Sequence, residues 1–195
     1  MIAIVSVSIA AEHTGVSKLQ LLCDAGADVH YRARTGQTSL HFAAQGQHSD
    51  AAANTRFCLG LGLSVTARAK DGVTPLHVAA MVRGEAAADV VRALLDAGAD
   101  PNPSTMSRSP LICAAGCGNN ASVRLLLEAS ARVEVRDDSG LSPLQASLKA
   151  CDADAVKCVF VSPSVMMVLM MVVMVGMVMT VVMMVVVTVV VTVVV

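Results

Sequence analysis

A short motif that recurs along the chain limits the possible fold more than any other feature of this sequence. Its best-preserved copy reads TPLHVAA, and the four copies begin at residues 38, 74, 109 and 142. Successive copies are therefore 36, 35 and 33 residues apart. Self-similarity at such a period is typical of repeat proteins, in which stacked helical units bury a core that no unit buries alone.

A second motif recurs between the copies of the first. It reads DAGADV at residues 24–29 and DAGADP at residues 96–101, with EASARV at residues 128–133 as a weaker copy. GLGLSV, at residues 60–65, stands in its place in the remaining unit. Coincidence rarely preserves two motifs in the same order, so the pattern predicts one continuous array.

Each unit is predicted to be a helix, a turn, a second helix and a loop. Thr74 suits the N-cap of the first helix, and Pro75 falls at the first helical position, where a missing N–H costs nothing. Leu76, Ala79 and Ala80 then share one helix face, and the alanines allow close approach of a neighbour. The second helix is marked by Val90, Val91, Leu94 and Leu95. The glycine of the AGAD motif is expected to end it in a left-handed conformation.

The sequence TPLHVA at residues 74–79 resembles the T-P-L-H-x-A signature of the ankyrin-repeat family. The resemblance implies an all-α solenoid with short β-turn fingers, in which finger tips and first helices line a concave binding surface. It also implies that the Thr and His of the motif hydrogen-bond within and between repeats. It covers residues 1–161, with a truncated first repeat at about 1–33 and further repeats at about 34–68, 69–103, 104–137 and 138–161.

Two units depart from the regular length. The second and third units are two or three residues longer than a regular unit. We expect the extra residues to bulge the loop that joins the two helices. Neither end has a polar capping repeat, so residues 1–161 alone are predicted to be marginally stable or to aggregate. Urea unfolding that shows a stable, cooperative monomer would contradict this.

Residues 162–195 form a low-complexity, uncharged tail dominated by valine and methionine. Three interpretations stay open. A run this long and apolar is normally a transmembrane helix, although no basic or aromatic anchors flank it. Translation of a trinucleotide-type repeat, or a mis-predicted C-terminus, would give the same near two-letter composition. A β-aggregating tail is the third. At the other end, residues 1–11 lack the basic start of a signal peptide and fit the repeat register instead.

Composition excludes some classes of function. The net charge is −1 and there is no Trp, one Tyr and three Phe, which argues against nucleic-acid binding. Six scattered cysteines match no secreted disulfide framework and indicate reduced thiols. The expected location is therefore cytoplasmic, or membrane-anchored if the tail inserts.

Several candidate sites have simpler structural interpretations. His41 and His77 occupy the same place in adjacent units, which favours a structural role over metal binding. Cys113 and Cys117 share a helix face, but with Cys151 and Cys158 they fit no zinc spacing. Asn120-Ala121-Ser122 is a glycosylation sequon that we interpret as chance, and Gly60–Gly62 lacks the rest of a phosphate loop. No catalytic constellation stands out, so neither enzyme activity nor a cofactor or metal is expected.

The finger tips are the better candidates for a binding site, and their residues are Tyr31, Arg32, Arg34, Arg68, Lys70, Asp71, Met106, Arg136, Asp137 and Asp138. The first two tips are basic and the last is acid-rich. The sequence thus predicts a non-enzymatic protein–protein interaction scaffold whose unidentified partner presents acidic groups to the N-terminal half. The alternative is that these are ordinary solvated loop charges.

Two other functions remain open at this level. The chain is a membrane-tethered adaptor if the tail inserts in a bilayer. It is a fragment of a larger ankyrin-containing enzyme or channel if it begins inside a repeat, as its N-terminus suggests. Fold alone does not decide between these functions.

Overall fold

A computed structural model describes residues 15–46, 49–103 and 108–150. These residues belong to one compact unit, Met1–Val159. They form α-helices and no strands, which confirms the predicted all-α class. The helices are α2 (Val16–Asp24), α3 (Ser39–Gln45), α4 (Ala51–Gly60), α5 (Pro75–Met81), α6 (Glu85–Asp96), α7 (Pro110–Cys117), α8 (Asn120–Glu128) and α9 (Pro143–Lys149).

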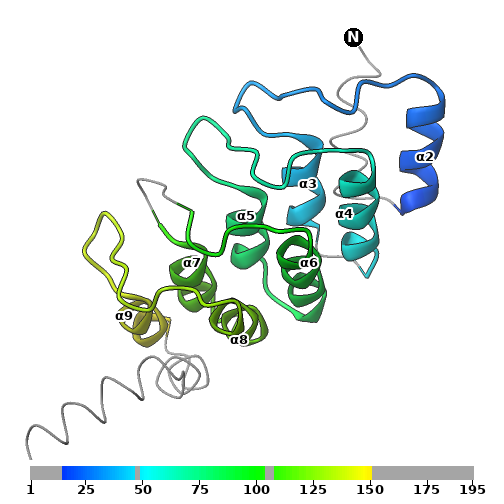
Figure 1. Cartoon of the computed structure of the whole chain (residues 1–195). Helices are drawn as coiled ribbons and strands as arrows, with labels where there is room; N and C mark the ends of the chain where they lie inside the picture. The colour runs from blue at the N-terminus through cyan, green and yellow to red at the C-terminus, as the bar shows by residue number, and fades with distance from the viewer. Residues whose placement is uncertain (1–14, 47–48, 104–107, 151–195) are drawn as a thin grey trace, which may run out of the picture. The chain divides into compact units, whose positions relative to one another are not determined.

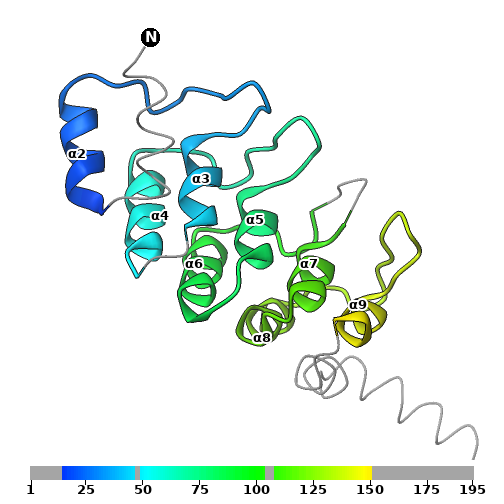
Figure 2. The ribbon, with the colours of Figure 1, turned by 180° about the vertical axis from the view of Figure 1, so that it is seen from behind.

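The helices stack in two rows, as Figures 1 and 2 show from opposite sides. The first-helix row is α3, α5, α7 and α9, in which each helix contacts the next. The second-helix row is α2, α4, α6 and α8, again with each packed on the next. Helix pairs α3–α4, α5–α6 and α7–α8 make up the complete units. This confirms the predicted solenoid of helix–turn–helix units.

First helices begin where the motif predicts. Thr38, Thr74, Ser109 and Ser142 are the N-caps of α3, α5, α7 and α9. Proline occupies the first position of three of them. An N–H at this position would have no intrahelical partner, so proline loses no hydrogen bond there. The serine caps accept a backbone hydrogen bond, from Ile112 N at 3.2 Å and from Gln145 N at 3.3 Å.

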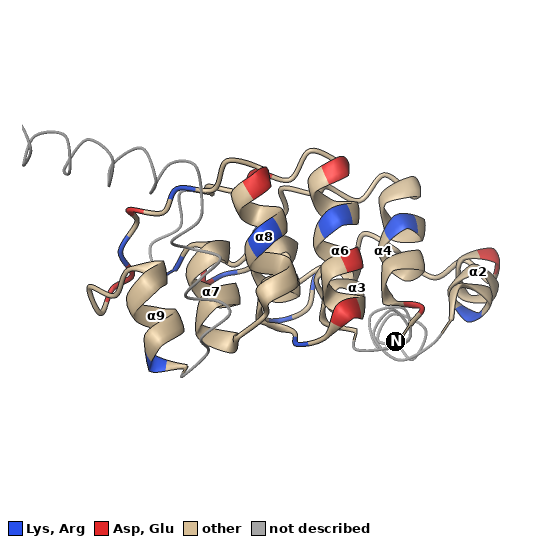
Figure 3. Cartoon of the chain, turned by 90° about the horizontal axis from the view of Figure 1, so that it is seen from below, with Lys and Arg blue, Asp and Glu red and all other residues tan. Residues whose placement is uncertain are grey.

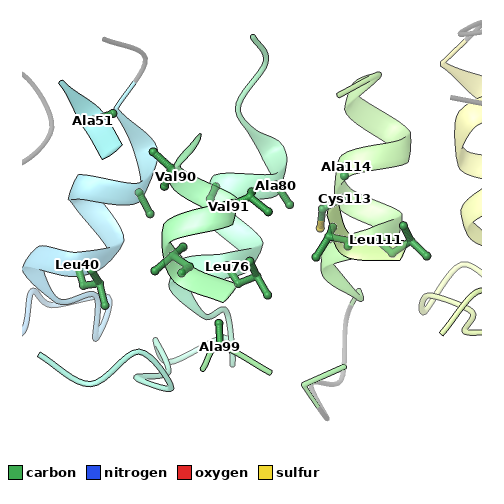
Figure 4. Packing of buried hydrophobic residues seen from close by; sticks show 14 of the residues in the cluster. Leu40, Ala51, Leu76, Ala80, Val90, Val91, Ala99, Leu111, Cys113 and Ala114 are labelled. Carbon is green, nitrogen blue, oxygen red and sulfur yellow. The ribbon is translucent and has the colours of Figure 1, made fainter. Parts of the chain in front are cut away.

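The core lies between the rows. The motif leucines Leu40, Leu76 and Leu111 are at most 1% exposed, and full burial of each contributes about 1.5–3 kcal/mol. Alanine pairs close the contacts between first helices, and all six are fully buried: Ala43, Ala44, Ala79, Ala80, Ala114 and Ala115. Figure 4 shows this packing for part of the cluster. Small side chains here let the helix backbones approach closely.

The extra residues of the two longer units can be located only in part. In the second unit the connection between α3 and α4 includes residues 47–48, which lie outside the described residues, so the expected bulge stays a prediction there. In the third unit α6 has 12 residues where α8 has nine, so most of the extra length becomes another helical turn. The expectation of a bulged loop was wrong there, because the alanines at residues 86–88 favour helix over loop.

Second helices end in a left-handed residue, as the AGAD motif predicts. Gly26, Gly62 and Gly98 have φ between +78° and +84°, and glycine adopts such values without strain. Gly60-Leu61-Gly62 is thus the end of α4 and its loop, and not a phosphate loop. In the fourth unit Ser130 takes the same place with φ +64°. It is the one non-glycine residue with positive φ among the described residues.

Four fingers connect the units: the first at residues 30–37, the second at 66–73, the third at 101–108 and the fourth at 134–141. Three share one hairpin turn. In the first, Ala33 N donates to Gln37 O and Gly36 N donates to Ala33 O, each at 2.8 Å. The second and fourth repeat this pair of bonds. Figures 1 and 2 show these fingers on the side of the first-helix row.

Residues 1–14, 104–107 and 151–195 lie outside the described part of the chain. The start of the first repeat, the end of the fifth and the whole tail therefore stay predictions. Within residues 15–46, 49–103 and 108–150, none of the helices combines the length and hydrophobicity that crossing a bilayer requires.

Candidate binding surface

The first and second fingers are joined directly. Lys70 N donates to Thr35 O at 2.9 Å, and the Arg32 guanidinium donates to Arg68 O at 3.1 Å. A Cβ on Gly36 would meet Lys70 N at 3.0 Å, so the fingers approach as closely as glycine allows. These contacts hold two basic tips, 36 residues apart in sequence, side by side.

Most of the predicted tip residues lie at the surface. The exposed ones are Arg32, Arg34, Arg68, Lys70, Asp71, Arg136 and Asp138. Tyr31 is half-buried, and Met106 lies outside the described residues. In the fourth finger, Arg136 donates to Gly140 O at 2.8 Å, within its own hairpin.

Asp137 differs from the other predicted tip residues, because its side chain is only 2% exposed. One carboxylate oxygen accepts hydrogen bonds from Ser139 N at 2.9 Å and Leu141 N at 2.8 Å. The other lies 3.5 Å from Arg108 Nε. Asp137 therefore holds the fourth finger in shape and joins it to the third, and it is not a surface available to a partner.

His41 and His77 join each unit to the next finger. The Nδ1 atom of His77 accepts from Thr74 N at 3.1 Å and lies 2.8 Å from the Thr74 hydroxyl. The Nε2 atom lies 2.8 Å from Arg108 O, and a carbonyl only accepts, so Nε2 carries the proton. His41 repeats this arrangement with Thr38 and with Val73 O at 3.1 Å.

These contacts support the structural role expected for the two histidines. Both nitrogens of each ring are engaged, which leaves no lone pair for a metal. Desolvation by burial lowers the pKa of both histidines, although the hydrogen bonds to the carbonyls oppose the shift. Each imidazole is therefore neutral at pH 7.

The cysteines of the described residues are free. Burial raises the pKa of Cys58 to about 12 and that of Cys113 to about 11, so both are thiols at neutral pH. Cys117 is half-buried, while Cys151 and Cys158 lie outside the described residues. Across the described ranges, His, Cys, Asp and Glu form no group suited to a metal ion.

The sequon at the start of α8 does not present a usual acceptor site. Ser122 is fully buried, and its backbone N–H donates to Asn119 Oδ1 at 3.2 Å. The folded protein thus hides the residue that completes the sequon.

Two asparagines link neighbouring units, and the motifs did not predict either. Asn119 caps α8 and also donates through Nδ2 to Val82 O, in the connection before α6. Asn102 donates to Ser130 O at 3.1 Å and accepts from Arg132 N at 2.7 Å. Because all three bonds join an asparagine side chain to a backbone atom of another unit, no pair of side chains in the sequence predicts them.

The second-helix row has a charge pattern unlike that of the fingers. Arg56, Arg92 and Arg124 stand at equivalent places in α4, α6 and α8, where Figure 3 shows a basic band on each helix. In α6 and α8 an acidic residue, Asp96 or Glu128, follows four positions later. This row therefore mixes charge signs, whereas the joined first and second fingers are mainly basic.

Stacked helix pairs joined by hairpin fingers define an α-helical repeat protein. The hydrogen bonds and the ion pair described above join one unit to the next. The family model for ankyrin repeats, described as three copies, matches residues 7–105 and 89–163. The chain belongs to the ankyrin-repeat family, as the TPLHVA motif predicted. None of the curated proteins matches it.

Proposed function

We propose that this chain is a non-enzymatic scaffold for protein–protein interaction, and that the joined first and second fingers bind an acidic segment of a partner protein. Membership of the ankyrin-repeat family supports the scaffold, because ankyrin repeats are generally protein–protein interaction modules and are typically non-enzymatic. The observation that carries the proposal is the pair of finger contacts from Thr35 and Arg32. They join the two fingers that carry the exposed side chains of Arg32, Arg34, Arg68 and Lys70, and Asp71 is the one acidic residue of these two fingers.

Electrostatics gives the reason for an acidic partner. Opposite charges across an interface speed encounter and fix the register, and exposed guanidinium groups bind carboxylates through two parallel hydrogen bonds. Because these charges are exposed, salt should weaken the interaction. At about 0.1–0.15 M salt, charges farther apart than the Debye length of about 8–10 Å are largely screened. The mixed-sign second-helix row lacks this bias.

Binding of a fluorescent oligo-glutamate peptide to the full chain tests the proposal. The test variant is Arg34→Glu/Lys70→Glu. Arg32 is kept, because it also donates to Arg68 O in the second finger, and its loss would change that contact as well as the charge. The control, Arg56→Glu/Arg92→Glu, changes the net charge equally on the second-helix row. We expect the finger variant to bind at least about tenfold more weakly and the control to bind nearly as well as the parent.

The same binding measurement can contradict the proposed function. If both variants weaken binding equally, net charge alone attracts the peptide and the fingers are not a site. If the parent does not bind at low salt, the acidic partner is wrong.

A cytoplasmic location is also proposed, supported by the free thiols of Cys23, Cys58, Cys113 and Cys117. Microscopy of the full chain with a fluorescent tag, followed by carbonate extraction, separates it from membrane anchoring through residues 162–195.

A further inference from the structure

Thr35, at the tip of the first finger, has an exposed hydroxyl. The hydroxyl donates to Gln37 Oε1 at 3.0 Å; Thr35 is exposed and Gln37 is half-buried. The backbone around it is fixed, because Thr35 O accepts from Lys70 N at 2.9 Å. A hydroxyl so placed is open to an enzyme that modifies side chains.

The residues before Thr35 resemble a kinase substrate in their charge. Arginines stand three and one positions earlier, at Arg32 and Arg34, and both are exposed. Kinase–substrate pairs are selected by charge pattern, so an acidic substrate groove would accept this segment. In the fourth finger Ser139 also has an arginine three positions earlier, but Asp137 and Asp138 intervene. The exposed carboxylate of Asp138 would repel the same groove.

The second finger indicates that the turn accommodates an anion at this place. Asp71 occupies the position equivalent to Thr35, and its carboxylate accepts from Val73 N at 3.3 Å, two residues further on. A phosphate on Thr35 would find Gln37 N at the corresponding place. It would also lie beside Lys70, whose Cγ would be 3.3 Å from a Cβ on Gly36.

Access by a kinase requires the tip to open, because an active site surrounds the hydroxyl. Three backbone hydrogen bonds hold the tip: Ala33 N to Gln37 O and Gly36 N to Ala33 O close the hairpin, and Lys70 N to Thr35 O joins it to the second finger. Each such bond contributes only about 0.5–1.5 kcal/mol net, and exposed hairpin ends open locally without global unfolding. The tip is therefore accessible at low energetic cost.

We propose that Thr35 is phosphorylated by an arginine-directed Ser/Thr kinase, and that the phosphate weakens the binding of acidic partners to the fingers. In the reaction Thr35 Oγ1 bonds to the γ-phosphorus of ATP and the bond to the ADP oxygen breaks. The hydroxyl proton passes to the catalytic aspartate of the kinase, and ADP leaves.

The effect of the phosphate on partner binding rests on the proposed function, and it follows from the charge of the two fingers. Arg32, Arg34, Arg68 and Lys70 against Asp71 amount to a formal charge of +3. A phosphate carries about −1.5 to −2 at pH 7, so it would cancel about half to two-thirds of that charge.

The test treats the full chain with Mg-ATP and the catalytic subunit of cyclic-AMP-dependent protein kinase. Intact mass counts phosphates and peptide mapping locates them. Oligo-glutamate binding is measured before and after. We expect phosphate on Thr35, none there in Thr35→Val, and an initial rate at least about tenfold lower in Arg32→Ala/Arg34→Ala. Binding of the peptide should weaken about fivefold or more after modification. Thr35→Val should bind as the parent does, because it keeps the backbone carbonyl that accepts from Lys70 N.

Each other outcome has a definite meaning. No phosphate at Thr35, or an unchanged rate without the arginines, overturns the site. A phosphate at Thr35 with unchanged peptide affinity overturns its effect on binding. If the unmodified chain does not bind the peptide, the proposed function fails together with the effect on binding, while the mass measurement still reports on the site.

Discussion

His41 and His77 make the stability of the array depend on pH. Burial lowers their pKa in the folded chain, while the unfolded chain binds protons near the ordinary value of 6.5. Between these values the unfolded state binds more protons, so stability falls as the pH falls. Above about pH 6.5 both states are neutral and this contribution is fully present.

We therefore expect the free energy of unfolding to decrease below about pH 6.5, by up to about 1.4 kcal/mol per histidine for each pH unit. Urea titrations at several pH values from 7.5 to 5 measure it. The His41→Gln/His77→Gln variant should lose most of this slope, and glutamine is a tolerated choice because Gln145 accepts from its cap Ser142 N at 2.9 Å. An equal slope in parent and variant would assign the pH dependence to other groups.

Ser130 is strained where other units have glycine. A residue with a Cβ at φ +64° costs roughly 1–2 kcal/mol relative to glycine. We expect Ser130→Gly to raise the free energy of unfolding by about 1 kcal/mol, measured by urea denaturation. Gly98→Ser is the matched reverse change at φ +84°, with nothing within 4 Å of the added Cβ, and should lower it by a similar amount. If Ser130→Gly leaves the free energy of unfolding unchanged, the turn accommodates Ser130 without strain.

Single residues also mark the limit of what the sequence predicts. The caps, the alanine pairs and the structural histidines follow from local motifs and were predicted. The burial of Asp137 was not, because it depends on Arg108, 29 positions earlier in the chain. A charge at a turn looks exposed in sequence unless its partner is known.

At the scale of helices, the alanine pairs limit what the first-helix row can hold. Ala79 and Ala80 are fully buried in α5 between neighbouring helices. Ala80→Leu should destabilise the protein by about 1–3 kcal/mol, because the added carbons force the helices apart. Met81→Leu is the control on the same helix, 53% exposed, and should change stability by less than about 0.5 kcal/mol. Thermal or urea unfolding measures both, and a tolerated Ala80→Leu would show that the row adapts.

Helix boundaries show where element-level prediction fails. The starts of α5, α7 and α9 follow from Thr or Ser before Pro. The start of α6 does not, because residues 85–88 serve equally as an inserted loop or as an added turn. Helix propensity, rather than the alignment of units, decides that case.

At the scale of the whole molecule, each helix packs mainly on its neighbours in the array. Among the described helices, α2 and α9 stand at the ends of their rows, and their Leu21 and Leu148 are 67% and 57% exposed. Repeat stability is a sum of unit and interface terms, so the centre should open least.

We expect hydrogen exchange of the full chain, followed by mass spectrometry, to be slowest in α5, α6 and α7 and fastest in α2 and α9. Uniform protection along all the described helices would contradict this and indicate a single cooperative unit. The repeat period alone predicts that the central helices are better protected than the terminal ones. The joining of the first and second fingers, which brings basic residues together, can be seen only in the structure.

The bonds from His41 and His77 to the next finger end on a backbone carbonyl. Every residue has such a carbonyl, so the bond makes no demand on the side chains of the unit that follows. For this hydrogen bond alone, a unit carrying Thr and His can be followed by a finger of any sequence.

The junction between the fourth and fifth units is different. Ile112 stands where the histidine would be, and the two fingers are joined instead by Arg108 and Asp137, two side chains that must match. The polar contact at a junction thus makes no demand on the following side chains where histidine is kept, and it needs a matched pair where histidine is lost. A repeat exchanged at the fourth junction would keep this contact only if Arg108 and Asp137 were moved together.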